Sequence, residues 1–225
     1  MVRQLSEADH AKVSAAIAAA EAKSDGEIVA VATPISDPYH DVALHWAVAA
    51  MILVLAWAAW RPDWLQWWYT LFFGGWSADP TLGELLTFLM VLAVLKFTAV
   101  LLILKWMPLR LALTPGATKS RRVRRRAIGI FKAAAERRTV GRTGILIYLS
   151  MAEHRAEIVA DEAITSKVAP EVWGEAMAAM LAELKRGRCG AGVVAAVERV
   201  GKVLAEHLPR AEGDVNELPD RLIEL

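Results

Sequence analysis

The sequence predicts an α/β domain that is cut in two by a transmembrane helical hairpin. Hydrophobic residues make up 56% of the 225 residues and the mean hydropathy is +0.34, which is too apolar for an ordinary soluble enzyme. Two long apolar segments lie in the first half of the chain, and helix and strand patterns flank them on both sides. We expect residues 1–41 and 115–210 to form the α/β domain, residues 42–107 the hairpin, and residues 211–225 an acidic tail.

The segment before the hairpin predicts one helix and one strand. Ser6–Asp9 resembles a capping box, and Gly26 is placed to end the helix. Three apolar residues keep helical spacing between them: Val13, Ile17 and Ala20. Glu27–Thr33, EIVAVAT, has the composition of a strand.

Two segments are long and apolar enough to cross a bilayer as helices. Val42–Trp60 has nineteen residues without a formal charge, and Leu85–Leu104 has twenty, interrupted only by Lys96. On the insertion scale this lysine costs roughly 3 kcal/mol, whereas fourteen Leu, Ile, Val and Phe residues contribute roughly 0.3 to 0.6 kcal/mol each. The second segment should therefore still insert.

Eight of the nine tryptophans lie between Trp46 and Trp106. Five of them crowd into and beside the connection between the spans: Trp60, Trp64, Trp67, Trp68 and Trp76. Indole rings favour the headgroup layer, where the ring is half buried and the N–H stays hydrated. An aromatic collar around the hairpin is the favoured interpretation, and an aromatic-lined ligand site is the alternative.

The charges beside the spans predict the orientation of the hairpin. The connection, residues 61–84, has one basic residue and three acids, whereas residues 105–142 have twelve basic residues and one acid. The positive-inside rule then predicts a two-pass protein of the cell (inner) membrane, with both termini and the α/β domain in the cytoplasm. The single cysteine, Cys189, is compatible with a reducing compartment.

A basic helix is expected to begin near Lys119, after the Pro115-Gly116 break. Its apolar residues fall on one face, so the domain can pack against it while the other face stays charged. The arginines on that other face are Arg121, Arg122, Arg124, Arg125 and Arg126. We expect them to contact anionic membrane lipids. No nucleic-acid partner is expected, because no aromatic residues interleave with this block.

Ile145–Ser150 and Ala156–Ala160 predict two strands that are joined by a tight turn. The turn carries an acid, a base and a cation in a row: Glu153, His154 and Arg155. Residues in such a turn usually face water, so a solvated turn is favoured over a catalytic role, and a surface for a partner is the third interpretation. Pro170–Lys185 and a last helix before Pro209 complete the domain.

This order of elements resembles the TPM domain family. The resemblance is clearest in LSEADHAKVSAAIAAAEAKSDGEIVAVAT and TGILIYLSMAEHRAEIVADEAI, and it covers about two thirds of the chain. It implies an α/β/α sandwich around a small mixed sheet, with the membrane hairpin inserted after the first strand. Some family members look like assembly, repair or accessory factors of membrane complexes, and others have been credited with metal-dependent phosphatase activity.

The chain departs from the family where a metal would bind. Many TPM domains enter the central strand through Asp-Asn-Gly, whereas this chain has Arg142-Thr143-Gly144. Many also have Gly-x-Gly after the second of these strands, where this chain has Asp161-Glu162-Ala163. Asp161 and Glu162 are thus the only local acids left to bind a divalent cation, and two carboxylates are a thin ligand set. We expect no cofactor, with a divalent cation as the alternative.

The sequence favours a membrane-anchored, non-enzymatic accessory, assembly or scaffold factor for membrane or envelope components. It contains no P-loop, GxGxxG, GxSxG or HExxH motif. A degenerate metal-dependent phosphatase is one alternative, and a small channel or transporter subunit is another. Lys96 has no acid at matching depth within the hairpin, so we expect a contact with another membrane protein or a second copy of the chain, while snorkelling beside lipid stays open.

Overall fold

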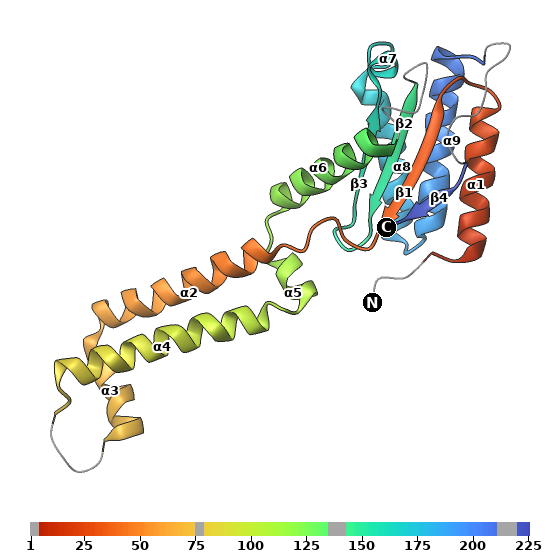
Figure 1. Cartoon of the computed structure of the whole chain (residues 1–225). Coiled ribbons are helices and arrows are strands. Elements are labelled where there is room, and N and C mark those ends of the chain that lie inside the picture. Colours follow the sequence, from red (N-terminus) through yellow and green to blue (C-terminus); the bar gives the residue numbers. More distant parts are fainter. Residues whose placement is uncertain (1–4, 75–78, 135–142, 211–219) are drawn as a thin grey trace. The chain divides into compact units, whose positions relative to one another are not determined.

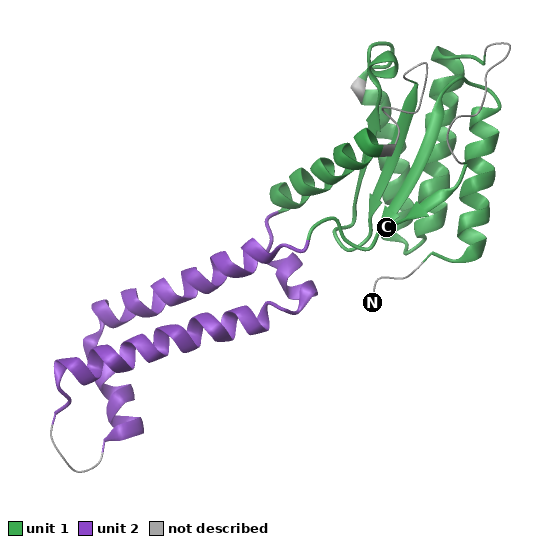
Figure 2. Cartoon of the chain, viewed as in Figure 1, with its two compact units in different colours: residues 1–37, 116–225 green, residues 38–115 purple. Residues whose placement is uncertain are grey.

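A computed structural model describes residues 5–74, 79–134, 143–210 and 220–225. The chain divides into two compact units, of which unit 1 comprises Met1–Asp37 and Gly116–Leu225, and unit 2 comprises Pro38–Pro115 (Figure 2). Three parts of the sequence predictions lie outside the described residues: Trp76 of the aromatic collar, Arg142 before the central strand, and residues 211–219 of the acidic tail.

Unit 1 is built on a four-stranded mixed sheet of order β3-β2-β1-β4 (Figure 1). Its strands are β1 (Glu27–Thr33), β2 (Gly144–Ser150), β3 (Arg155–Ala160) and β4 (Leu222–Glu224). The central strand β1 runs parallel to β2 and to β4, and β3 pairs antiparallel with β2. All residues of β1 and β2 are buried, which explains why both strands are apolar on both faces.

Helices cover both faces of this sheet (Figure 1). One face packs against α1 (Glu7–Glu21), α8 (Pro170–Lys185) and α9 (Cys189–His207), and the other packs against α6 (Gly116–Ala134). Two apolar clusters result, one on each side of the sheet. The predicted fold class, an α/β/α sandwich with a small mixed sheet, is confirmed.

The predicted capping box at the start of α1 is present. The Ser6 hydroxyl accepts a hydrogen bond from the Asp9 N–H (3.2 Å), and the Asp9 carboxylate accepts one from the Ser6 N–H (3.1 Å). These bonds satisfy donors that the first turn of a helix leaves unpaired. The helix ends at Glu21, five residues before the predicted stop at Gly26.

Unit 2 contains the two helices that are long and apolar enough to span a membrane, α2 (His40–Trp60) and α4 (Leu82–Ile103). They lie side by side (Figure 1), and most of their large apolar side chains are exposed. The residues buried along α2 are small or β-branched: Val42, Ala43, Ala47 and Ala58. Ala93 is the buried residue of α4. Small buried side chains such as these alanines let two helices approach closely.

Short helices complete unit 2 where the sequence predicted only connections. Helix α3 (Pro62–Phe73) follows α2, with Pro62 in its first turn, where the missing N–H has no cost. Helix α5 (Met107–Ala112) follows α4 and buries Arg110. The Arg110 guanidinium donates to the carbonyl of Leu104 (2.7 Å) and to that of Pro38 (2.6 Å), so it ties the two ends of unit 2 together.

The predicted aromatic cluster lies at the end of α2 and along α3. Ring pairs with centroids 5.2 to 6.4 Å apart link Trp57 with Trp60, Trp64 with Trp68, and Trp67 with Trp68. All three pairs are edge-to-face, the arrangement that the aromatic quadrupole favours. The cluster therefore packs against itself within unit 2.

A close helix contact in unit 1 yields a stability prediction. A Cβ on Gly201 of α9 would lie 2.6 Å from the Cβ of Ala20 on α1, whereas a Cβ on Gly174 of α8 meets no described atom within 4 Å. Gly201→Ala should lower the free energy of unfolding of unit 1 by roughly 1–3 kcal/mol because it overpacks the contact. Gly174→Ala should raise it by roughly 0.4–1 kcal/mol. Urea unfolding in mild detergent, followed by circular dichroism, measures both; an unchanged midpoint for Gly201→Ala would contradict the close packing.

Candidate functional site

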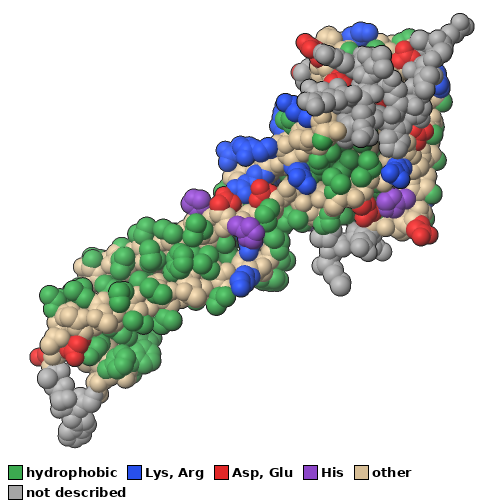
Figure 3. Space-filling view, viewed as in Figure 1, with side chains coloured by type: hydrophobic (Ala, Val, Ile, Leu, Met, Phe, Trp, Pro, Cys, Tyr) green, Lys and Arg blue, Asp and Glu red, His purple; other side chains and the backbone are tan. Residues whose placement is uncertain are grey.

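The basic face of α6 is the largest set of exposed charges that the sequence predicted. Val123, Ala127 and Phe131 point into the core against β1 and β2, because they recur every four residues on one face of the helix. The exposed surface of this helix carries four arginines: Arg121, Arg124, Arg125 and Arg126. Figure 3 shows Lys and Arg side chains gathered over α6. We call these four residues the α6 basic face.

Arg122, the fifth predicted lipid contact, differs from the α6 basic face. Its guanidinium forms a 2.7 Å ion pair with the carboxylate of Asp37, and only 17% of the Arg122 side chain is exposed. Asp37 is the last residue of unit 1 before the chain enters unit 2. The ion pair therefore joins the segment after β1 to α6. The charge of Arg122 is paired within unit 1.

A buried network of polar side chains lies at the carboxyl ends of β1 and β2. The Ser36 hydroxyl donates to the Ser150 hydroxyl (2.8 Å) and lies 2.8 Å from the hydroxyl of Tyr148. The Glu153 carboxylate accepts hydrogen bonds from the Ser36 N–H (2.9 Å) and from the Ser150 hydroxyl. Burial raises the pKa of the Tyr148 hydroxyl. Because Tyr148 and Ser150 are fully buried, the hydrogen bonds among these hydroxyls and the Glu153 carboxylate stabilise the fold.

This network corrects the prediction for the turn between β2 and β3. The side chain of Glu153 was expected to face water, but Glu153 is only 6% exposed. Its two oxygens pair donors of Ser36 and Ser150 that burial would otherwise leave unsatisfied. His154 is exposed and adopts the left-handed backbone conformation, with φ of 51°. Arg155 is half-buried and donates to the hydroxyl of Ser120 on α6 (2.5 Å), so His154 alone of the three presents an exposed side chain.

The two acids predicted to bind a cation lie side by side in the chain but in different surroundings. Asp161 is 6% exposed, and its carboxylate accepts a hydrogen bond from the N–H of Gly144 at the start of β2 (3.2 Å). Glu162 is exposed in the first turn of α7 (Glu162–Thr165). Among the described residues, no group of three or more His, Cys, Asp or Glu side chains could hold a metal ion. Asp161 thus stabilises the start of β2.

Glu21, at the end of α1, is a buried acid that the sequence analysis missed. It is 8% exposed, and one carboxylate oxygen accepts a hydrogen bond from the N–H of Ile28 (2.7 Å), while the other has no hydrogen-bond partner among the described residues. Burial raises the pKa of Glu21 to about 8, and the nearby acids Asp220 and Glu27 add to the rise. The signal was in the sequence, because Glu21 follows Val13 and Ile17 at four-residue spacing on the buried face of α1.

Lys96 is exposed on α4, in the middle of the longest apolar helix. Glu84 lies in the first turn of α4, more than two helical turns from Lys96. Asp41 lies in the first turn of α2. No ion pair involving Lys96 occurs among the described residues. A charged side chain in such apolar surroundings is a feature that membrane proteins use for contacts within the membrane.

Comparisons with known proteins bear on the whole arrangement. Residues 114–203 match the family model of the TPM domain. Among solved structures, the chain is similar to the NMR structure of the BA42 protein from the psychrophilic bacterium Bizionia argentinensis, with a TM-score of 0.56 and 16% sequence identity. That likeness covers 99% of this chain and 97% of that chain, and at this identity it concerns the fold alone. A comparison with curated protein sequences gave no match.

The buried carboxyl group of Glu21 predicts a pH dependence of stability. The pKa of Glu21 is about 8 in the folded chain and close to its ordinary 4.5 in the unfolded chain. Between these values the folded chain binds more protons, so unit 1 should lose stability as the pH rises from about 4.5 to about 8. Glu21→Gln keeps an acceptor for the Ile28 N–H and removes this loss.

At pH 8.5, Glu21→Gln should therefore raise the free energy of unfolding by roughly 2–4 kcal/mol, since each unit of pKa shift corresponds to about 1.4 kcal/mol. At pH 4.5 the variant and the wild type should be nearly equal. Glu206→Gln, at an exposed position of α9, is the matched control and should show no such gain. Urea titrations at both pH values measure the difference, and a gain of equal size at pH 4.5 would rule out ionisation as its cause.

Proposed function

Since residues 114–203 match the family model of the TPM domain, we propose that the chain is a membrane-anchored TPM-domain protein that acts without catalysis. Unit 2 anchors the chain, unit 1 presents the TPM domain, and Lys96 pairs with an acidic group of another membrane protein or of a second copy. The activity is that of an accessory, assembly or scaffold factor for membrane or envelope components. The exposed position of Lys96 within an apolar helix is the observation that carries the proposal.

The dimensions of α2 and α4 and the charges that flank them support membrane insertion with unit 1 in the cytoplasm. Helices α2 and α4 have 21 and 22 residues, which corresponds to about 32 Å, close to the roughly 30 Å of a bilayer's hydrocarbon core. Twelve basic residues follow α4 within residues 105–142, against one basic residue in the connection at residues 61–84. The positive-inside rule assigns the basic flank, and with it unit 1, to the cytoplasmic side.

The depth of Lys96 favours a contact with a protein partner. At 1.5 Å per residue, Lys96 lies about 18 Å along α4 from Glu84 and about 13 Å from Lys105. Side chains in a helix lean toward its N-terminus, so the Lys96 side chain leans away from the nearer end of α4. Snorkelling is therefore hindered, and a carboxylate on a partner satisfies the ammonium group at that depth. A contact of this kind selects a partner that carries an acid within its own span.

The α6 basic face gives unit 1 a second attachment. Four exposed guanidinium groups on one helix suit the anionic headgroups of the cytoplasmic leaflet, where each basic residue contributes on the order of 1 kcal/mol. Such an attraction is screened by salt. It would hold the TPM domain close to the membrane, and Arg122 takes no part because it is paired with Asp37.

A metal-dependent phosphatase is the second candidate, because the family model that matches residues 114–203 carries phosphatase in its name. Asp161 and Glu162 are the acids that would take part. Asp161 is buried, with its carboxylate hydrogen-bonded to the Gly144 N–H, whereas Glu162 is exposed in the first turn of α7. This difference weighs against a shared cation. The proposal for a non-catalytic role is accordingly preferred.

Replacing Lys96 tests the non-catalytic proposal. Lys96→Leu should leave the chain inserted but reduce the mass of the complex obtained in mild detergent, whereas Lys96→Arg should retain the complex because it keeps the charge. Lys105→Leu removes an exposed lysine just beyond α4 and is the matched control. Mass photometry of the purified complexes gives the masses. An identical mass for wild type and Lys96→Leu would leave snorkelling beside lipid as the explanation of this lysine.

A soluble chain in which residues 1–37 are joined by a Gly/Ser linker to residues 116–225 tests the α6 basic face. It should bind anionic vesicles and dissociate in high salt. Replacing Arg121, Arg124, Arg125 and Arg126 with Gln should weaken binding by several kcal/mol, at about 1 kcal/mol per residue. The control replaces four exposed cations, two at the end of α8 and two on α9: Lys185, Arg186, Arg199 and Lys202. Vesicle co-sedimentation measures binding, and equal binding to neutral vesicles would refute the electrostatic attachment.

The phosphatase candidate is tested with a generic phosphomonoester. The purified full chain should show no turnover that depends on added Mg²⁺, Mn²⁺ or Ca²⁺. The Asp161→Ala, Glu162→Ala double variant is assayed in parallel, to identify contaminating phosphatase. Turnover that requires the metal ion and disappears in the double variant would establish the phosphatase and displace the accessory role.

A further inference from the structure

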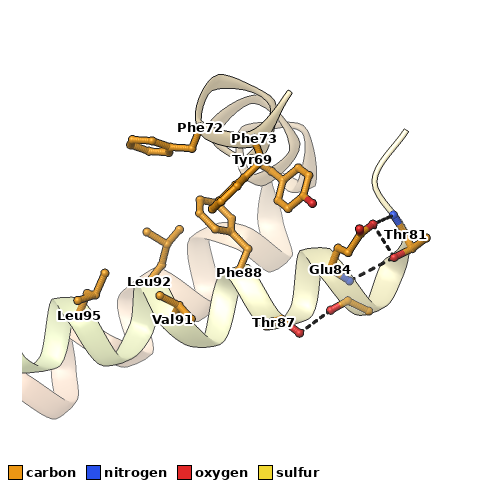
Figure 4. A pocket seen from close by; sticks show the side chains of 11 residues that line it. Tyr69, Phe72, Phe73, Thr81, Glu84, Thr87, Phe88, Val91, Leu92 and Leu95 are labelled. Carbon is orange, nitrogen blue, oxygen red and sulfur yellow. Dashed lines mark hydrogen bonds between the residues drawn. The ribbon is translucent and has the colours of Figure 1, made fainter. Parts of the chain in front are cut away.

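An elongated groove lies between α3 and α4 in unit 2 (Figure 4). Its volume is about 760 Å³, within the range of roughly 300–1,000 Å³ that is typical of small-molecule sites. One wall is aromatic, because the rings of Tyr69, Phe72 and Phe73 on α3 pack 5.7 to 6.4 Å from the ring of Phe88 on α4. The groove belongs to unit 2 alone and is separate from the α6 basic face and from Lys96.

The two ends of the groove differ in polarity. Thr81, Glu84 and Thr87 line the end at the start of α4, and Figure 4 shows the Tyr69 hydroxyl directed toward the same end. Val91, Leu92 and Leu95 line the other end. Glu84 and Leu95 are separated by eleven residues of one helix, which is about 16 Å. A ligand that fills the groove therefore has a polar head and an apolar chain.

The chemistry of the polar end defines the head. The Glu84 carboxylate accepts hydrogen bonds from the Thr81 N–H (2.8 Å) and hydroxyl (2.7 Å), both at Oε2. The Thr87 hydroxyl donates to the carbonyl of Gly83 (2.8 Å), so its oxygen offers only lone pairs to the groove. Among the described residues that line the groove, Glu84 is the sole charged one. Acceptors and one negative charge suit a ligand head that donates hydrogen bonds and is positively charged.

We propose that this groove binds one acyl chain of a membrane lipid whose head carries an ammonium group, with the ammonium at Glu84 and the chain along Val91, Leu92 and Leu95. The inference rests on the proposed insertion of unit 2 into a membrane. The exposed fractions of Phe72, Phe73 and Leu95 are 61%, 65% and 59%, and a contiguous exposed apolar surface of this kind favours contact with an apolar ligand. Lipid supplies that cover, and Glu84 selects among lipids by the charge of the head.

The test uses the full chain, purified in mild detergent and incubated with phosphatidylethanolamine or phosphatidylglycerol of identical acyl chains. Native mass spectrometry counts the lipids that remain bound. The wild type should retain the ammonium-bearing lipid better by up to about fivefold, the upper end of the range for an exposed ion pair. Glu84→Gln should abolish this preference while keeping α4 intact, because Gln can replace Glu in the capping box. An unchanged preference in Glu84→Gln would refute the assignment of the head.

Two matched valine substitutions test the acyl chain. Val91 and Val94 are exposed on α4, but only Val91 lines the groove. Val91→Trp should fill the groove and lower retention of both lipids severalfold, and Val94→Trp should behave as wild type. Equal retention in the two variants, or a polypeptide bound in place of lipid, would refute the groove as a lipid site.

Alkaline extraction of membranes separates this inference from the proposal on which it rests. Wild type and Val91→Trp should both stay in the membrane pellet, since the substitution leaves the apolar surface of α4 intact. If the groove inference fails, the chain is still retained in the pellet, but lipid counts do not respond to Val91 or Glu84. Release of the wild type by alkaline extraction would instead refute membrane anchoring itself.

Discussion

The parallel pairing of β1 with β2 is the interaction on which the rest of the chain depends. Seven residues of each strand pair in register, from Glu27 opposite Gly144 to Thr33 opposite Ser150, although all of unit 2 separates them in sequence. Parallel neighbours require a crossover connection, and here the crossover contains both the apolar hairpin and α6. The central strand β1 therefore obtains its main partner only after the chain has passed through unit 2. Contacts of such large sequence separation carry a high entropic cost, which the buried strands must offset.

Polar contacts fix the places where the chain leaves and re-enters unit 1. Asp37 and Arg122 form an ion pair next to both places, and Glu153 holds Ser36 just after β1. Buried polar groups stabilise a fold only when all of them are paired. The hydroxyls of Ser36 and Ser150 and the carboxylate of Glu153 pair with one another, so this network holds the segment that follows β1 against the end of β2.

Local patterns predicted most of the fold, and long-range pairings account for what they missed. The Ser6–Asp9 capping box and the spacing of Val13, Ile17 and Ala20 predicted α1, and the composition of Glu27–Thr33 predicted β1. The burial of Glu153 depends on Ser36, 117 residues away in sequence, and no local pattern encodes that contact. Strand β4 has three residues and exists because it pairs with β1. The groove of unit 2 forms between α3 and α4, and α3 was predicted only as an aromatic connection.

The orientation of unit 2 is tested most directly by labelling single cysteines in intact cells with a membrane-impermeant maleimide. One chain keeps the native, half-buried Cys189 of unit 1, and the other combines Cys189→Ser with Asp79→Cys just before α4. If unit 2 spans the membrane with unit 1 in the cytoplasm, the cysteine at position 79 reacts at once and Cys189 reacts only after the cells are permeabilised. The reverse pattern, or immediate labelling of both, would contradict membrane anchoring with a cytoplasmic TPM domain.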